Sequence, residues 1–302
     1  MQNNRYIPNY IIVILIIFML GGISMASPIP SEIKSVVVFI FVKNEEGKLF
    51  ANGTGFFVGV KNTSNPYFFS VYLVTAKHVL YKSNTTDFLD KVFVRLNKKE
   101  GGSQIGVIPI ITEGEKRNVF THSDSSVDIV VISCLPDQEK YDFKFLTDDL
   151  ITTKEAFKEL KIREGSDVFF TGLFTPYMGS ERNYPIVRFG RVALVTDEKI
   201  EWQGKLMDLY LIEAGSYGGN SGSPVFFYLG SDREPGSIVI GSPILKLAGV
   251  MQGTFLDAYE IKVVETKEIP IAVSSMGIAA VVPGYKLHEI LFSDELKGKR
   301  GF

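Results

Sequence analysis

The segment at residues 215–224 places a serine, Ser221, in a glycine-rich run between two apolar stretches. A serine hydroxyl becomes a good nucleophile only when a neighbouring base takes its proton, and the oxyanion formed by its attack on a carbonyl needs hydrogen-bond donors. Glycine permits tight turns in which backbone amides converge on one point, so the amides of Gly219 and Ser221 are the candidate oxyanion hole. The alternative is a glycine-rich hairpin that carries an incidental serine, and the segment alone leaves both interpretations open.

Three histidines could supply the base. His78 follows the apolar residues 71–74, and the end of a rigid strand is a place where a site residue can be held accurately. His122 lies in a polar loop and His288 lies in a predicted helix, so we expect both of these side chains to be solvated. His78 is therefore the candidate base, with a purely structural histidine as the alternative.

A base of this kind also needs a carboxylate that orients its imidazole. Asp128 precedes the apolar residues 129–132, and a carboxylate at the start of an apolar strand is costly to bury without a partner. Asp124 is the rival, but it lies in a polar loop where water can solvate it. The sequence therefore favours Asp128 as the orienting group.

The elements that must position these residues are mostly strands. Short apolar runs separated by turn residues at hairpin spacing are typical of barrels or sandwiches. The predicted strands lie at residues 35–42, 55–60, 67–75, 92–96, 105–110 and 128–133, and then at 168–172, 186–195, 208–213, 224–229, 237–240, 247–252 and 276–282. Helices are predicted at residues 153–160 and 285–292.

The strands form two groups of similar size, which predicts an all-β chain with two halves. The first half spans residues 35–140, a polar and partly helical link spans 141–165, and the second half with its closing helix spans 166–292. A site that two halves share lies in the cleft between them, and we expect His78 and Ser221 to meet there.

Composition excludes several classes of function. The 302 residues are 45% hydrophobic, which is enough to bury a full core. The formal net charge is −2 and no basic block occurs, so nothing favours nucleic acid as a partner. A single cysteine, Cys134, excludes an intramolecular disulfide, and we expect it to be buried. Without a histidine pair at metal-ligand spacing or an acidic ligand loop, we expect no metal and no other cofactor.

The N-terminal segment is typical of an exported protein. Arg5 precedes an unbroken apolar run at residues 11–20, and a small-x-small site ends at Ala26. This pattern predicts a secretory signal at residues 1–26 that is cleaved after Ala26, and hence a periplasmic or secreted protein. The alternative is an uncleaved segment that anchors the protein to a membrane, for which the run is short.

The three candidate segments together resemble those of chymotrypsin-like (trypsin-like) serine proteases. Residues 75–78, Thr-Ala-Lys-His, look like the Thr-Ala-Ala-His motif of that family. Residues 127–130, Val-Asp-Ile-Val, resemble its Asp-Ile-Ala-Leu segment, and residues 219–224, Gly-Asn-Ser-Gly-Ser-Pro, are similar to Gly-Asp-Ser-Gly-Gly-Pro. The order His, Asp, Ser distinguishes this family from other triad folds. The resemblance covers residues 35–292, of bacterial type without disulfides.

The resemblance implies a fold and an activity. The fold would be two six-stranded antiparallel β-barrels with a C-terminal helix and a catalytic triad of His78, Asp128 and Ser221 at their junction. The activity would be that of a serine endopeptidase that cleaves polypeptides through an acyl-enzyme. The alternatives are a catalytically silent binding protein with the same fold, and an esterase.

Two departures from the family pattern have consequences. In the family's zymogens a cut exposes an ammonium that pairs with the aspartate before the nucleophile, but here that residue is Asn220. We therefore expect the site to form on folding, without a cut. The second departure concerns the first specificity pocket, whose floor would be the uncharged Gly215, so cleavage after Lys or Arg is not expected and an apolar or small residue is favoured. The walls of that pocket would come from Met251, Gln252, Gly253, Thr254 and Gly277. If the alignment slips by two residues, Glu213 takes the place of Gly215 and brings a negative charge to the floor.

Overall fold

The computed structural model describes residues 29–63, 65, 67–112, 117–230, 243–260 and 271–300. The expected signal or anchor at residues 1–26 and the expected strand at 237–240 lie outside these residues. Within the described ranges, no helix has the length and the apolar character that crossing a bilayer requires.

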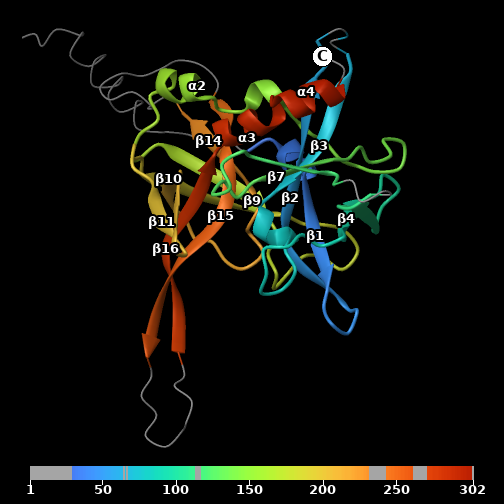
Figure 1. Ribbon diagram of the computed structural model, residues 1–302, viewed down its shortest axis with the longest axis horizontal. Helices are drawn as coiled ribbons and strands as arrows, with labels where there is room; N and C mark the ends of the chain where they lie inside the picture. The colour runs from blue at the N-terminus through green and yellow to red at the C-terminus, as the bar shows by residue number, and fades with distance from the viewer. Residues whose placement is uncertain are drawn as a thin grey trace, which may run out of the picture.

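The chain is built mainly from antiparallel strands (Figure 1). The strands are β1 Val37–Lys43, β2 Leu49–Lys61, β3 Phe69–Thr75, β4 Lys91–Asn97, β5 Ser103–Pro109, β6 Val119–Thr121, β7 Val130–Ser133, β8 Leu146–Thr147, β9 Asp167–Gly172, β10 Ile186–Leu194, β11 Ile200–Trp202, β12 Lys205–Met207, β13 Tyr210–Glu213, β14 Pro224–Leu229, β15 Ile244–Glu260 and β16 Ile271–Pro283. The α-helices are α2 Lys154–Glu159, α3 Gly284–Leu291 and α4 Asp294–Arg300.

The first half is a curled eight-stranded sheet, which we call the first sheet. Its order is β5-β4-β1-β2-β3-β7-β6, and β8 pairs with β2 in parallel. The two ends of the sheet approach each other, because the amide of Asn118 donates to the carbonyl of Ile110 at 2.8 Å and residues Ile111 and Arg117 form an isolated bridge. Curling in this way encloses a core of its own.

The second half is a closed six-stranded barrel, which we call the second barrel. Its order is β10-β13-β16-β15-β14-β9, and it returns to β10. Phe170, Ile212, Phe227 and Val281 are fully buried inside it. The register of β15 against β16 shifts twice, between Met251 and Gly253 and again beyond Thr254, where bulges bend the strand.

Strand β1 shows how the two halves are joined. It has a run of six apolar residues, and because successive side chains of a strand point to opposite faces, the two faces can serve different cores. Val38 and Ile40 pack inside the first sheet, whereas Phe39 packs in a larger core that also contains Phe169 and Phe226 of the second barrel. The halves therefore share one continuous apolar interface.

The C-terminal helices lie against one end of the two halves (Figure 1). In α3 the buried side chains Leu287, Ile290 and Leu291 lie on one face and join the shared core. Glu289, on the same helix, binds the side chain of His122 in the first half, with 2.6 Å between Oε2 and Nε2. The expectation that His122 is solvated is wrong, because this contact leaves its side chain only 11% exposed.

The expected chymotrypsin-like architecture is confirmed, with differences in detail. The first sheet has more strands than the six predicted, because β6 and β8 are too short to give a periodic pattern. The segment expected as a link, residues 141–165, contains β8 and α2, whose first turn is capped by Thr153. Strands β15 and β16 continue well past the predicted segments and extend beyond the barrel as a two-stranded ribbon (Figure 1).

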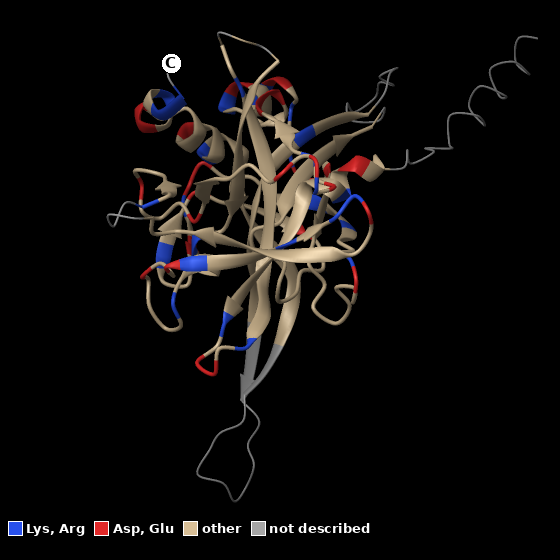
Figure 2. Cartoon of the chain, turned by 90° about the vertical axis from the view of Figure 1, so that its right-hand side faces the viewer, with Lys and Arg blue, Asp and Glu red and all other residues tan. Residues whose placement is uncertain are grey.

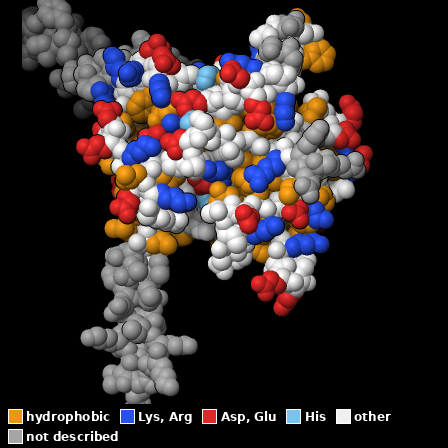
Figure 3. Space-filling view, viewed as in Figure 1, with side chains coloured by type: hydrophobic (Ala, Val, Ile, Leu, Met, Phe, Trp, Pro, Cys, Tyr) orange, Lys and Arg blue, Asp and Glu red, His pale blue; other side chains and the backbone are white. Residues whose placement is uncertain are grey.

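Charged residues lie mainly in loops and in the C-terminal helices, and the strands of both halves carry few of them (Figure 2). On the face seen in Figure 3, basic and acidic side chains are interspersed over the surface. This distribution agrees with the small net charge of the sequence.

Candidate active site

His78 lies where the sequence placed it, just after strand β3 of the first sheet. A 3₁₀ turn, Lys77–Leu80, follows that strand, and its side chains Val79 and Leu80 are buried in the core of the first sheet. The backbone of the turn is tied to the segment before β7, because the amide of Lys77 donates to the carbonyl of Asp128 at 3.3 Å. The turn therefore fixes the direction in which the imidazole points.

Asp128 makes two hydrogen bonds to His78. Its Oδ1 accepts from the backbone amide of His78 at 3.1 Å, and its Oδ2 lies 2.5 Å from His78 Nδ1. The carboxylate side chain is 10% exposed, whereas that of His78 is 40% exposed. A carboxylate bonded to Nδ1 leaves Nε2 as the nitrogen that can accept a proton from a substrate-side group.

Asp124, the rival, has other partners and does not contact His78. Its Oδ1 accepts from the amide and the hydroxyl of Ser126, and its Oδ2 lies 3.2 Å from Lys199 Nζ. These hydrogen bonds, first of all those from Ser126, hold the pKa of Asp124 well below its usual range. His288 stacks on Phe292, with ring centroids 4.4 Å apart, and burial lowers its pKa.

Ser221 sits on a tight turn that needs glycine on both sides. Gly219 has φ +94° and Gly222 has φ +83°, and residues other than glycine rarely adopt these backbone angles. A Cβ on Gly222 would also lie 2.2 Å from the carbonyl oxygen of Thr54. Between them, Asn220 is 1% exposed and braces the turn, since its Nδ2 donates to Leu173 O at 2.6 Å and its Oδ1 accepts from Tyr217 N at 3.0 Å.

Thr54, in β2 of the first sheet, clamps this turn from the other half of the molecule. Its hydroxyl donates to the carbonyl of Gly219 at 2.8 Å and accepts from the amide of Leu173 at 3.0 Å. Its own amide donates to the carbonyl of Ser221 at 2.9 Å. Sequence reasoning gave this residue no role, because its partners lie more than one hundred positions away.

His78, Asp128 and Ser221 line one groove of about 510 Å³. In this structure the hydroxyl of Ser221 donates to the carbonyl of Gln252 at 3.2 Å. The hydroxyl is therefore not hydrogen-bonded to His78 here, and the bond between a nucleophile and its base is often long or misaligned until a substrate is bound. Among the described residues, the amides of Gly219 and Ser221 are hydrogen-bonded to no acceptor, so both donors are available to a ligand.

Only some of the residues predicted to form the first specificity pocket line the groove. Gln252, Gly253 and Thr254 line the groove, but Gly215 and Gly277 are not among its lining residues. Gly277 lies beside the residue that precedes Gly215, since its carbonyl accepts a hydrogen bond from the amide of Ala214 at 3.0 Å. The space beside Gly215 holds the guanidinium of an arginine from β10, which sequence reasoning did not anticipate.

The groove also contains residues that were not predicted to belong to it. Trp202 and Lys205, from the β11–β12 hairpin, lie on one side together with Lys77. The side chain of Lys77 is largely buried and its Nζ donates to the carbonyl of Ser125 at 2.7 Å. Burial lowers the pKa of Lys77, and the opposing charge of Asp128 limits that shift. Burial and the charge of Asp128 both raise the pKa of Tyr81, which also lines the groove.

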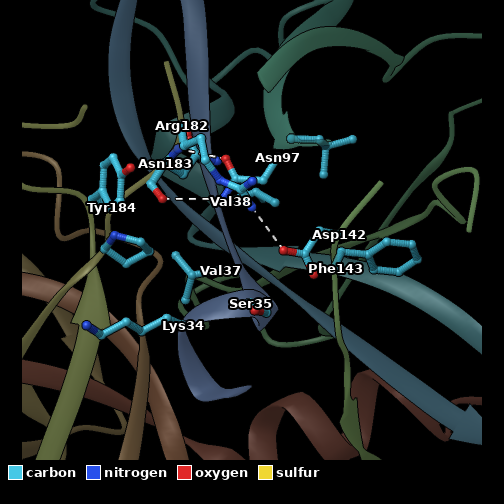
Figure 4. A pocket seen from close by; sticks show the side chains of 12 residues that line it. Lys34, Ser35, Val37, Val38, Asn97, Asp142, Phe143, Arg182, Asn183 and Tyr184 are labelled. Carbon is cyan, nitrogen blue, oxygen red and sulfur yellow. Dashed lines mark hydrogen bonds and ion pairs between the residues drawn. The ribbon is translucent and has the colours of Figure 1, made fainter. Parts of the chain in front are cut away.

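A separate cavity of about 210 Å³ lies beside β1 and β4 (Figure 4). Asn183 N donates to Asn97 Oδ1 at the end of β4 at 2.7 Å, and Arg182 Nη2 lies 3.0 Å from Oδ2 of Asp142, in the segment before β8. None of the candidate catalytic residues lines this cavity. These contacts strap the loop after β9 to the first sheet, and we assign the cavity a structural role.

Cys134 is not part of the groove. Burial raises the pKa of its thiol to about 11, so the thiolate, which is the reactive form, is scarce at neutral pH.

Comparison with known proteins assigns the chain to a family. A model of the trypsin-like peptidase domain matches residues 53–231, which is more than half of the chain and includes His78, Asp128 and Ser221. No curated protein matches the sequence.

The solved structures that match the chain include the following two. The apo protease domain of MamO from Magnetospirillum magneticum has 15% identity and a TM-score of 0.47, and the match covers 86% of this chain and 97% of that one. An inactive serine-to-alanine variant of Rv3671c from M. tuberculosis has 17% identity and a TM-score of 0.41, and the match covers 93% of this chain and 98% of that one. The family match over residues 53–231 shows that this chain belongs to the family of trypsin-like peptidase domains.

Proposed function

We propose that the protein is a serine endopeptidase that cleaves polypeptides through an acyl-enzyme. The observation that carries the proposal is the groove, in which a histidine bonded through Nδ1 to a buried carboxylate faces the same space as a serine on a glycine turn. The family assignment supports a peptidase activity. We assign the individual catalytic roles to His78, Asp128 and Ser221 from their positions in the groove.

In the proposed reaction the hydroxyl of Ser221 turns from the carbonyl of Gln252 towards His78. Nε2 of His78 takes the hydroxyl proton as Oγ attacks the scissile carbonyl, and Asp128 stabilises the resulting imidazolium. The carbonyl oxygen, now negative, receives hydrogen bonds from the amides of Gly219 and Ser221. His78 then gives its proton to the leaving amine, which leaves Ser221 acylated. Water hydrolyses the ester by the same route, and the hydroxyl is restored.

The state of Asn220 supports a site that forms on folding. Its side-chain amide donates a hydrogen bond to Leu173 O and accepts one from Tyr217 N, both in the same half of the molecule. No ammonium is therefore needed to hold the turn. We propose that the enzyme needs no activating cut. Purified full-length chain should therefore be active without any internal cleavage.

A fluorophosphonate probe tests the proposal directly, since it reacts only with a serine that a neighbouring base activates. We expect the probe to label Ser221 in the wild type, and to label neither Ser221→Ala nor His78→Ala. Degradation of an unfolded protein substrate by the wild type distinguishes a peptidase from an enzyme that hydrolyses small esters only. A well-folded wild type that is not labelled would instead be a binding protein with the same fold.

We also propose that the chain is exported, from the charged, apolar and small-residue pattern at residues 1–26. Mass spectrometry of protein recovered from the producing cell should find an N-terminus at residue 27. A chain that starts at Met1 and fractionates with membranes would show that the segment is an anchor.

A further inference from the structure

We propose that Arg188 selects an acidic side chain, Asp or Glu, on the residue immediately before the scissile bond. The inference rests on the proposed proteolytic function and gives it a substrate class. It replaces the expectation of an apolar or small residue, which considered only the uncharged Gly215.

Arg188 points towards the interior of the second barrel. Alternate residues of a strand share a face, and on β10 Val192 lies on the same face as Arg188 and is packed in the barrel core. Phe189 and Arg191 lie on the opposite face, with exposed fractions of 67% for Phe189 and 68% for the Arg191 side chain. A charged side chain on the inner face of a barrel strand requires a partner of its own.

The guanidinium lies beside the glycine that the family resemblance places at the floor of the first specificity pocket. A Cβ on Gly215 would lie 2.9 Å from Nη1 of Arg188, so the guanidinium occupies the space directly beside this glycine. The guanidinium also stacks on the ring of Tyr217, with Cζ 4.6 Å from the ring centroid. Tyr217 lines the groove together with Ser221, so Arg188 packs directly against a side chain of the groove wall.

The donors of Arg188 have no acceptor in the part of the chain that the structure describes. Its Nε is buried without a hydrogen bond, and Arg188 makes no ion pair there. By contrast, Arg95 is buried with all three nitrogens bonded, to Asn183 Oδ1 and to the carbonyls of Gly179 and Met178. A buried donor without an acceptor is costly, and a planar guanidinium fits a carboxylate best.

The remaining charges of the groove favour the same partner. Lys77 and Lys205 line it, and the one carboxylate among its described lining residues, Asp128, is already bonded to His78. An acidic substrate residue therefore enters a groove with an excess of positive charge, and no carboxylate of the groove is left to attract a lysine or an arginine.

Peptide-library cleavage tests the inference. With the wild type at pH 7.5, we expect kcat/KM for Glu or Asp before the cut to exceed that for Gln or Leu by about 100-fold. Arg188→Gln should remove this preference, and Arg188→Glu should reverse it in favour of Lys. Arg191→Gln is the matched control, since Arg191 lies on the same strand but faces outward and pairs with Asp167 at 3.2 Å, and it should keep the wild-type preference.

Fluorophosphonate labelling separates this inference from the proposed function. Labelling of Ser221 needs the nucleophile and its base but no peptide side chain, so it also shows that the Arg188 variants are folded. If both variants fail to label, Arg188→Lys, which keeps the charge, should retain a smaller acidic preference. An enzyme that labels but prefers apolar or basic residues before the cut, or selects acids at another position only, overturns the role of Arg188 and leaves the peptidase intact. A folded wild type without labelling and without cleavage overturns both.

Discussion

Asn220 offers a sharp test of how the nucleophile turn is held. Replacing it with aspartate restores the residue type that the resembled proteases carry, but without an ammonium to neutralise it. An ionised carboxylate at this position could still accept from Tyr217 N, but it could not donate to Leu173 O, which Asn220 contacts at 2.6 Å. Because the position is 1% exposed, the substitution would also bury a charge. We therefore expect Asn220→Asp to disable the site at neutral pH.

The cost can be worked from these contacts. An unsatisfied carbonyl costs about 1–3 kcal/mol, and a buried carboxylate adds a further cost, so we expect about 3–5 kcal/mol in all. At about 1.4 kcal/mol per factor of ten, the turn would be formed roughly 10²–10⁴ times less often, and the labelling rate at pH 8 would fall in proportion. When protonated, the new carboxyl can donate to Leu173 O and accept from Tyr217 N, as asparagine does.

The variant should therefore recover in acid. Burial raises the pKa of the new carboxyl in the folded state above its unfolded value. Its contribution to stability is therefore fully present below the unfolded pKa and is lost as the pH rises through the folded pKa. The assay is the fluorophosphonate labelling rate of the variant divided by that of the wild type, from pH 5 to 8, because a pH dependence that both proteins share cancels in the ratio. The ratio should rise towards one as the pH falls.

Asn44→Asp is the matched control, since Asn44 is exposed in a turn and accepts from Lys48 N, a role that aspartate keeps. Its labelling ratio should stay near one at every pH. If Asn220→Asp labels as fast as the wild type at pH 8, or if its ratio does not change with pH, the bracing role assigned to Asn220 is wrong.

Three further changes probe other contacts. Asp128→Asn should lower kcat by about 10³–10⁴-fold with little change in urea stability, because it upsets the imidazole tautomer; a fall below tenfold in steady-state assays would contradict this role. Thr54→Val should lower the free energy of unfolding by about 2–4 kcal/mol, since it leaves Gly219 O and Leu173 N unpaired, and a variant of wild-type stability in urea titration would refute the clamp. Burial raises the pKa of Glu289, but the hydrogen bond to His122 and the charges of Lys286 and Lys154 outweigh this effect, so the pKa is lowered overall. Glu289→Gln should therefore lower the free energy of unfolding by about 1 kcal/mol at pH 7. That difference is present above the unfolded pKa and should disappear as the pH falls through the folded pKa of Glu289, as measured by thermal unfolding; a cost that stays constant into acid would exclude the ion pair as its source.

Local patterns allowed much of the site to be predicted. His78 and Asp128 could be selected because each adjoins an apolar strand, and Ser221 because its glycines are contiguous in the sequence. The two-half fold followed from strand spacing. These signals work because the interactions that they report, strand packing and tight turning, involve neighbouring residues.

Contacts between distant residues gave no such signal. The partners of Thr54 lie 165 and 119 positions away, and Glu289 lies 167 positions from His122. Arg188 was missed because Gly215 was considered without the strand packed beside it. The predicted strand at residues 247–252 was too short, because the bulges after Met251 and Thr254 interrupt the alternation by which a strand is recognised.

The clamp from Thr54 has a consequence for the newly made chain. Residues 37–133, which supply the imidazole and the clamp, leave the ribosome before the segment that carries Ser221. Because the backbone of the Ser221 turn is hydrogen-bonded to Thr54 of the first sheet, we expect this turn to reach its final shape only when the two halves have packed together. In the proposed peptidase, a chain whose second half has not yet docked would therefore lack an assembled site.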